Sequence, residues 1–143
     1  MEEFLLQLHH GEVLTPMQAR QHNPLALAYV GDTVYDLYVR THLLKTQAVN
    51  SHRLHVLAIG YVSAHAQAAA FRRMETLLNE DELYIYRRGR NTKPTTVPRN
   101  ADVQEYRCAT GLEAVVGYLF LSGQYERLSQ LMERVLAPQE KTV

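Results

Sequence analysis

Asp32 is the residue whose position in this sequence most suggests chemistry. It follows Gly31 inside an apolar segment that is patterned as one helix, and Asp36 lies one helical turn later. A carboxylate in an apolar helix is costly to bury unless a partner or a cation compensates its charge. A glycine within a helix costs about 1 kcal/mol relative to alanine, and it is tolerated where another backbone or a ligand must come close. The alternative is that Asp32 is a solvated surface acid beside a packing glycine.

The segment from Asn23 to Arg40 supplies the helix that carries this acid. Asn23 can cap the helix, because its side chain accepts a hydrogen bond from a free backbone N–H, and Pro24 suits the first helical position. Apolar residues then recur at three- and four-residue steps, which predicts a stripe that faces the core. The predicted stripe consists of Leu27, Val30, Val34, Leu37 and Tyr38. We expect the helix to end near Lys45.

The remaining periodic segments predict a succession of further helices. Short helices are expected over residues 2–9 and 16–21, the second of them capped by Thr15. Asn50 or Ser51 is expected to cap the next helix, and Ser63 to cap another that runs through residue 78. A helix capped by Asn79 or Asp81 is expected to end at Gly89, before a loop over residues 89–101. Helices are then predicted at about 102–122 and 124–136, and the last seven residues are expected to be frayed.

The sequence predicts an all-α fold. No segment of useful length alternates between apolar and polar residues, and the tripeptide YIY at 84–86 has neighbours that favour a helix. No repeat or long linker divides the chain. We therefore expect one compact helical domain over residues 1–143.

Composition and charge set further limits. Hydrophobic residues make up 46% of the 143 residues and charged residues 21%, which is typical of a globular chain. Fifteen basic and fifteen acidic residues cancel, so any contact with a polyanion must be local. The one cysteine, Cys108, excludes an internal disulfide and reads as a small packed residue. No signal peptide or run of ~18 apolar residues is present, so we expect a cytoplasmic protein without a membrane partner.

Two segments of the chain resemble the ribonuclease III family. Tyr29, Val30, Gly31 and Asp32 match its signature helix, in which an aromatic residue, an aliphatic residue, Gly and Asp follow in a row. Near the other end, residues 106–119 read YRCATGLEAVVGYL and resemble the family's second acidic helix. The short chain looks most like the Mini-ribonuclease III branch, which has no double-stranded-RNA-binding domain. The resemblance implies a compact helical ribonuclease III-type endonuclease domain, to which we expect no RNA-binding domain to be appended.

The resemblance also implies a metal site between Asp32 and Glu113, which falls on the family's final metal-binding glutamate. Carboxylates on two facing helices can hold Mg²⁺, which supplies a nucleophilic water and neutralises phosphate charge. Mg²⁺ is therefore the expected cofactor, with Mn²⁺ as a substitute. Ala28 and Thr110 stand where the family has two further acids, so the number of metal ions stays open. Asp36 is either a third ligand or a salt-bridged or capping acid.

Basic residues cluster once in the chain, with no acid among them. Such a run is either a solvated loop or a cationic loop that grips RNA phosphates without reading bases, and the phosphoesterase signature favours RNA contact. The Arg-Gly-Arg-Asn wording at 88–91 also resembles a Mini-ribonuclease III segment. The RNA-binding residues predicted in this way are Arg87, Arg88, Arg90, Lys93 and Arg99.

Tyr29 stands where the family places an aromatic side chain in a pocket of the partner subunit. The resemblance therefore implies a homodimer built on the signature helix, with Tyr29 at the dimer interface; the alternative is an ordinary core aromatic. A zinc site is not expected. His52 and His55 share one helical face, but no His-Glu-x-x-His motif or cysteine pair accompanies them.

The function implied by the resemblance is metal-dependent cleavage of double-stranded RNA. Each subunit would cut one strand and leave 5′-phosphate and 3′-hydroxyl ends. The branch further implies maturation of the 23S ribosomal RNA precursor, with a ribosomal protein as a candidate partner. The alternative is a non-catalytic ribonuclease III-like module that binds duplex RNA or assists ribosome assembly. A purely structural helical dimer would leave the basic run unexplained.

Overall fold

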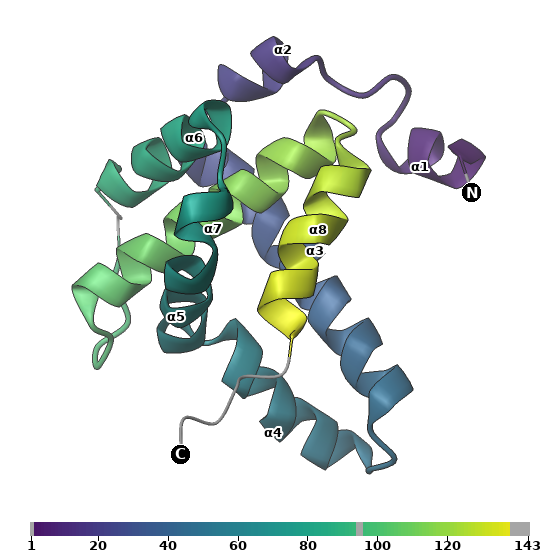
Figure 1. Cartoon of the computed structure of the whole chain (residues 1–143), viewed down its shortest axis with the longest axis vertical. Coiled ribbons are helices and arrows are strands. Elements are labelled where there is room, and N and C mark those ends of the chain that lie inside the picture. The colour runs from purple at the N-terminus through teal and green to yellow at the C-terminus, as the bar shows by residue number, and fades with distance from the viewer. Residues whose placement is uncertain (1, 94–95, 138–143) are drawn as a thin grey trace.

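The computed structural model describes residues 2–93 and 96–137, and every regular element in these ranges is helical (Figure 1). In chain order they are α1 (Glu2–Leu8), α2 (Pro16–Arg20), α3 (Pro24–Thr46), α4 (Ser51–Val62), α5 (Ala64–Met74), the 3-10 turn η1 (Glu75–Leu77), α6 (Glu80–Asn91), α7 (Val103–Leu121) and α8 (Tyr125–Leu136). The predicted all-α fold is confirmed. The predicted frayed end lies outside the described residues, apart from Ala137. No single helix of this part of the chain is long and apolar enough to cross a membrane; α4 and α5 meet that test only together, across a 51° bend.

Side-chain caps fix the starts of five helices where the sequence predicts them. Each capping oxygen accepts a hydrogen bond from a backbone N–H of the first turn, which would otherwise have no partner. The caps of α2 to α6 are Thr15, Asn23, Asn50, Ser63 and Asn79. The predicted break of the long periodic run at Ser63 is therefore confirmed.

The predicted end of α6 is wrong. The helix continues through Gly89 to Asn91, so the loop begins at Thr92 rather than at residue 89. Gly89 acts as a packing residue, because a Cβ atom there would lie only 2.9 Å from the Cα of Gly111 in α7. Arg90, which the prediction placed in the loop, is consequently helical like Arg87 and Arg88, and only the later part of the basic run lies in the loop.

The predicted core stripe of α3 is also wrong in part. The buried side of the helix advances mainly by four residues and comprises Pro24, Leu27, Ala28, Gly31, Tyr35, Val39 and Leu43. Of the five predicted stripe residues only Leu27 is fully buried, and Leu37 is 65% exposed. Apolar residues surround this helix, so its sequence satisfies more than one stripe and cannot by itself select the side that packs.

Helix α7 runs through the centre of the molecule and packs against α3, α5, α6 and α8 (Figure 1). Its crossing with α3 is very close. A Cβ atom on Gly31 would lie 1.7 Å from the carbonyl oxygen of Glu113, and one on Gly117 would lie 1.9 Å from that of Leu27. The two helices therefore touch backbone to backbone, which only glycine permits at these two positions.

A buried ion pair joins α6 to α8. Glu82 is fully buried, and the Nε and Nη2 atoms of Arg127 donate to its two carboxylate oxygens, each over 2.8 Å. Glu82 Oε1 also accepts from the backbone N–H of Asn79, which closes a capping box at the start of α6. This acid is fully used in holding the fold and is not available for chemistry.

Replacing Gly117 by alanine is expected to cost well over 1–3 kcal/mol, roughly the usual cost of overpacking, because the new methyl group meets backbone that cannot rotate away. Gly60→Ala is the matched control: Gly60 also lies within a helix, but a Cβ atom there would meet nothing within 4 Å. It should stabilise the protein by up to about 1 kcal/mol. Urea unfolding followed by circular dichroism measures both. Equal midpoints for Gly117→Ala and wild type would contradict the close crossing.

Candidate active site

The crossing of α3 and α7 brings Asp32 and Glu113 to one cavity. Because Gly31 contacts the backbone carbonyl of Glu113, the next residue of α3 emerges at the edge of the same contact. Both acids line a cavity of about 440 Å³. Asp32 is exposed and Glu113 is partly buried. The apolar pattern of α3 suggested that Asp32 would be the buried acid, but the more buried of the two is Glu113 of α7. The structure thus unites two residues that lie far apart in the sequence.

Four parts of the chain form this acidic cavity. Apart from Asp32 of α3, its lining comes from the α4–α5 junction, the loop that precedes α7, and one side of α7. The lining residues from these parts are Val62, Ala64, Gln67, Pro98, Ala101, Tyr106, Ala109, Thr110 and Glu113. Oxygen atoms from carboxylates, an amide and hydroxyls therefore gather around an opening large enough for a phosphate group.

The pKa of Glu113 is raised by burial and by the neighbouring acid. Burial raises the pKa of Glu113 to about 9, and hydrogen bonding to Asp32 and its charge add to the rise, while hydrogen bonding to Gln67 opposes it. Two carboxyl groups this close cannot both ionise easily unless a cation lies between them. At neutral pH the metal-free site therefore holds a proton on Glu113.

A divalent cation fits this pair. Hard cations such as Mg²⁺ prefer carboxylate oxygens and keep several water ligands, and a cation would replace the proton on Glu113. Within the described residues, no three side chains of His, Cys, Asp or Glu come together in a metal-binding arrangement. The cavity therefore offers two acidic ligands, and water or substrate oxygens would have to complete the coordination of a metal ion.

Asp36 has a partner of its own. Its Oδ2 atom lies 2.9 Å from Nε of Arg40, one turn further along α3. Of the two interpretations left open by the sequence, a salt-bridged acid matches this contact, and Asp36 is not among the residues that line the acidic cavity.

The predicted RNA-binding residues differ in how they lie. Arg88 is partly buried and its Nη1 donates to the backbone carbonyl of Arg20. Arg90 lies over the ring of Tyr86 and donates through Nε to the side chain of Asn91. The other three, Arg87, Lys93 and Arg99, are exposed, and Arg99 follows Pro98, which lines the acidic cavity.

Tyr29 projects from α3 into solvent and is 81% exposed, so it is not a core aromatic. It lines a wide apolar groove of about 860 Å³ between α1, α3 and the α7–α8 corner. Other members of its lining are Phe4, Leu8, Val34, Leu37 and Leu128. The sequence signal for this groove is the second apolar side of α3. The predicted core stripe had assigned residues of that side, such as Val34 and Leu37, to the core.

Cys108, His52 and His55 lie outside the lining of the acidic cavity. Cys108 is partly buried and its Sγ accepts a hydrogen bond from the hydroxyl of Tyr86 over 3.2 Å. Burial raises the pKa of the Cys108 thiol, which disfavours the reactive thiolate. His52 and His55 are both exposed on α4 and are not part of the acidic cavity.

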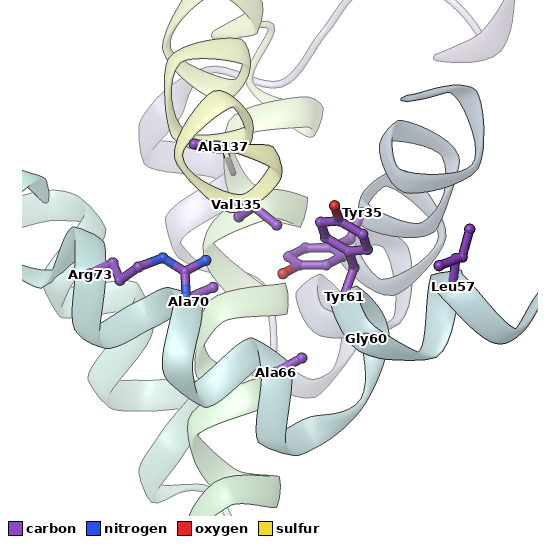
Figure 2. A pocket seen from close by; sticks show the side chains of 9 residues that line it. All are labelled: Tyr35, Leu57, Gly60, Tyr61, Ala66, Ala70, Arg73, Val135 and Ala137. Carbon is purple, nitrogen blue, oxygen red and sulfur yellow. The ribbon is translucent and has the colours of Figure 1, made fainter. Parts of the chain in front are cut away.

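A second cavity, of about 320 Å³, lies between α3, the α4–α5 pair and the end of α8 (Figure 2). Tyr35 and Tyr61 both line it, and the guanidinium group of Arg73 points toward their side of the cavity (Figure 2). The hydroxyl of Tyr35 is buried without a hydrogen-bond partner in the described part of the chain, and burial raises the pKa of Tyr35. Among the described residues no acid lines this cavity, and we therefore do not consider it further as a metal site.

Comparison with known proteins supplies the family. Residues 25–124 match the ribonuclease III domain, a span that contains Asp32, Glu113 and the α3–α7 crossing. The chain belongs to the ribonuclease III family. It is therefore an endoribonuclease of this type, from a family that acts on double-stranded RNA, generally depends on divalent metal ions and typically dimerises.

Relatives within the family match most of the chain. The chain is 43% identical over 127 residues to Mini-ribonuclease 3 of Clostridium tetani, which covers 88% of this chain and 84% of that protein. It is 47% identical over 128 residues to Mini-ribonuclease 3 of a Thermoanaerobacter species, with coverage of 88% and 89%. A crystal structure of a Fusobacterium nucleatum protein superposes with a TM-score of 0.74 at 30% identity, covering 82% of this chain and 93% of that one.

The structure distinguishes the two positions, 28 and 110, at which the resemblance implied further acids. Ala28 is nearly buried on the core side of α3, where an acid would displace packed side chains. Thr110 lines the acidic cavity itself, and its hydroxyl donates to the backbone carbonyl of Tyr106 over 3.0 Å. The cavity therefore has space for a further ligand at 110 and very little at 28.

Replacing Glu113 by glutamine is expected to stabilise the metal-free protein at pH 8. The folded pKa of about 9 lies above the unfolded value near 4.5, so the stability associated with the Glu113 proton is complete below about pH 4.5 and is lost as the pH rises toward 9. A neutral amide avoids this loss. We expect an unfolding temperature about 2–5 °C above wild type at pH 8 in EDTA, and equal values near pH 4.5.

Differential scanning calorimetry across this pH range provides the measurement. Added Mg²⁺ should raise the unfolding temperature of wild type and have less effect on Glu113→Gln, since a ligand stabilises only the state that binds it. A constant difference between the two proteins from pH 4.5 to 8 would mean that Glu113 ionises normally.

Proposed function

We propose that this ribonuclease III-family protein hydrolyses double-stranded RNA as a homodimer, with Mg²⁺ held between Asp32 and Glu113. Mn²⁺ is the expected substitute. The observation that carries the proposal is the meeting of these two acids in one open cavity, at a helix crossing that cannot relax. A purely binding module would have no need to keep two carboxyl groups so close, because their repulsion costs free energy and repels RNA phosphates.

Each part of the cavity has a task in phosphodiester hydrolysis. A bound Mg²⁺ would lower the pKa of a bound water and neutralise charge on the scissile phosphate. Asp32 is the more exposed of the two acids, so it is the one that solvent and an incoming phosphate can reach more easily. The backbone of Glu113 lies in the α3–α7 contact, and hydrogen bonding to Gln67 favours the ionised form of its side chain, which lowers its pKa. Attack of water on phosphorus with departure of the 3′-oxygen would leave 5′-phosphate and 3′-hydroxyl ends.

RNA would be held by the exposed basic residues around this opening. Arg99 is best placed, because its neighbour Pro98 lines the acidic cavity. Arg87 and Lys93 are exposed and free to reach backbone phosphates further along the duplex. Arg88 and Arg90 have contacts within the fold, so we propose for them a smaller part in RNA binding than the sequence suggested.

The apolar groove beside Tyr29 supports a homodimer. A side chain as large as tyrosine that is 81% exposed next to a groove of about 860 Å³ suits a two-fold contact, in which each subunit offers both the side chain and the groove. Asp32 follows three residues later on the same helix. Dimerisation through this side of α3 would place two acidic cavities in one assembly, one for each RNA strand.

The biological substrate that we propose is the precursor of large-subunit ribosomal RNA, which includes the 23S species. The support is the likeness to Mini-ribonuclease III over most of the chain. A ribosomal protein bound to that RNA is a candidate partner, and the cytoplasm is the corresponding location.

Asp32→Asn is expected to abolish cleavage of duplex RNA in Mg²⁺, with a loss of about 100-fold or more, because an amide binds the metal ion less well than a carboxylate. Size, helicity and RNA affinity in EDTA should remain near wild type, since Asp32 is exposed and packs against nothing essential. Asp36→Asn is the matched control: it lies one turn away on the same helix but outside the cavity, and it should cleave normally. Turnover by Asp32→Asn within tenfold of wild type would contradict the assignment.

Tyr29→Ala is expected to weaken subunit association at least tenfold, because a two-fold interface loses the same contact twice. Leu44→Ala is the control: Leu44 is a similarly exposed apolar residue of α3 that lies outside the groove. Sedimentation velocity over a range of protein concentrations measures the dimer constant of each. A wild-type protein that stays monomeric at micromolar concentration would disprove the homodimer.

A further inference from the structure

His65 and Glu105 form a hydrogen-bonded pair next to residues that line the acidic cavity. Nδ1 of His65 lies 2.5 Å from Oε2 of Glu105, so the contact joins the first turn of α5 to the first turn of α7. Ala64 and Tyr106, the chain neighbours of the two residues, both line the cavity. The pair is therefore close enough to the cavity to be considered as a contact for a nucleic-acid strand whose phosphate enters there.

Glu105 is held in place by a contact that does not involve His65. Its backbone N–H donates to Oδ1 of Asp102, the residue that caps α7, over 3.0 Å, and its carboxylate is mostly buried. The carboxylate accepts from Nδ1 and so sets the orientation of the imidazole ring. The His65 side chain is 80% exposed, which leaves Nε2, on the other edge of the ring, directed to solvent. In the imidazolium form of His65 this Nε2 is an oriented donor, whereas in a neutral ring that donates through Nδ1 it would accept.

The acids around the opening suggest what a donor at this position would do. Asp32, Glu113 and Glu105 place three acids within or beside the cavity, and each repels an RNA phosphate when it is ionised and not compensated by a cation. The metal ion offsets the first two. Glu105 is covered by His65, and an imidazolium ring beside a carboxylate donates through both nitrogens, one to the acid and one outward. The pair can thus present a donor to RNA where an acid alone would repel it.

We propose that His65 contacts a backbone phosphate of the RNA adjacent to the scissile one, and that Glu105 is a positioning residue that aims the His65 ring. The proposal rests on the duplex-RNA cleavage proposed above. It adds a substrate-binding residue outside the family's acidic motifs and outside the basic run. Because the contact lies away from the bond that breaks, it stabilises the bound substrate and the transition state equally. It should therefore affect KM more than kcat.

The test is steady-state cleavage of one short duplex RNA at saturating Mg²⁺ by wild type, His65→Gln, His65→Lys, Glu105→Gln and the double variant His65→Gln/Glu105→Gln. His65→Gln should raise KM about three- to tenfold, as expected for loss of a charge-assisted hydrogen bond, and change kcat by less than twofold. His65→Lys should restore KM, because lysine keeps a cationic donor. The double variant should have a lower KM than His65→Gln, because the uncovered carboxylate is gone.

The matched control is His52→Gln, an exposed histidine at the far end of α4, about 15 Å along the helix from the cavity-lining residue Val62. It should leave KM and kcat unchanged. An unchanged KM in His65→Gln would overturn the proposal. So would equal falls in unfolding temperature for His65→Gln and Glu105→Gln with KM unaffected, which would show a purely structural link between α5 and α7.

The outcome for His65 is separable from that of the proposed function. A wild-type protein that cleaves no duplex RNA would overturn the proposed function. The same five proteins are then compared by their affinity for the duplex, and a His65→Gln variant that binds as tightly as wild type would overturn the inference about His65. Weaker binding by His65→Gln, with recovery in His65→Lys, would support it in either case.

Discussion

The backbone contact between α3 and α7 is the constraint on which the rest of the molecule depends. Gly31 and Gly117 let the two longest helices approach until carbonyl oxygens occupy the space of side chains. Two rigid backbones in contact have almost no freedom to slide, so the spacing of Asp32 and Glu113 is set by the fold rather than by side-chain rotamers. Packing that cannot relax is the general means by which proteins hold reacting groups within a fraction of an ångström.

This fixed spacing has an electrostatic cost that a cation can remove. Glu113 carries a pKa of about 9 because it is buried beside another acid, which marks a site that is strained without its ligand. Glu82 shows the opposite case in the same protein. It is more deeply buried, but Arg127 and a backbone N–H satisfy both of its oxygens, so it contributes to holding α6 on α8. The difference between these two buried acids separates a functional carboxyl group from a structural one.

Helix α3 has three distinct surfaces, and each serves a different purpose. One side packs in the core through residues such as Tyr35, one exposes Tyr29 and Leu37 to the apolar groove, and one presents Asp32 to the acidic cavity. In the proposed dimer, subunit contact, chemistry and folding are therefore linked through this single helix. A change in how two subunits meet would be felt at the cavity without any movement of a loop.

The sequence alone determined where most helices begin and which two acids, Asp32 and Glu113, are the candidates for a metal site. Caps and turns act through neighbours in the chain, so side chains such as Ser63 fix helix starts locally, and the motifs around Asp32 and Glu113 carry the family resemblance. Only the tertiary structure decided which side of α3 is buried, because apolar residues surround that helix and α7 selects one side. It also extended α6 through Gly89, because that glycine packs against Gly111 of α7 and does not end the helix. The pairing of His65 with residue 105 left no signal in the sequence, since contacts between distant residues depend on how whole helices pack.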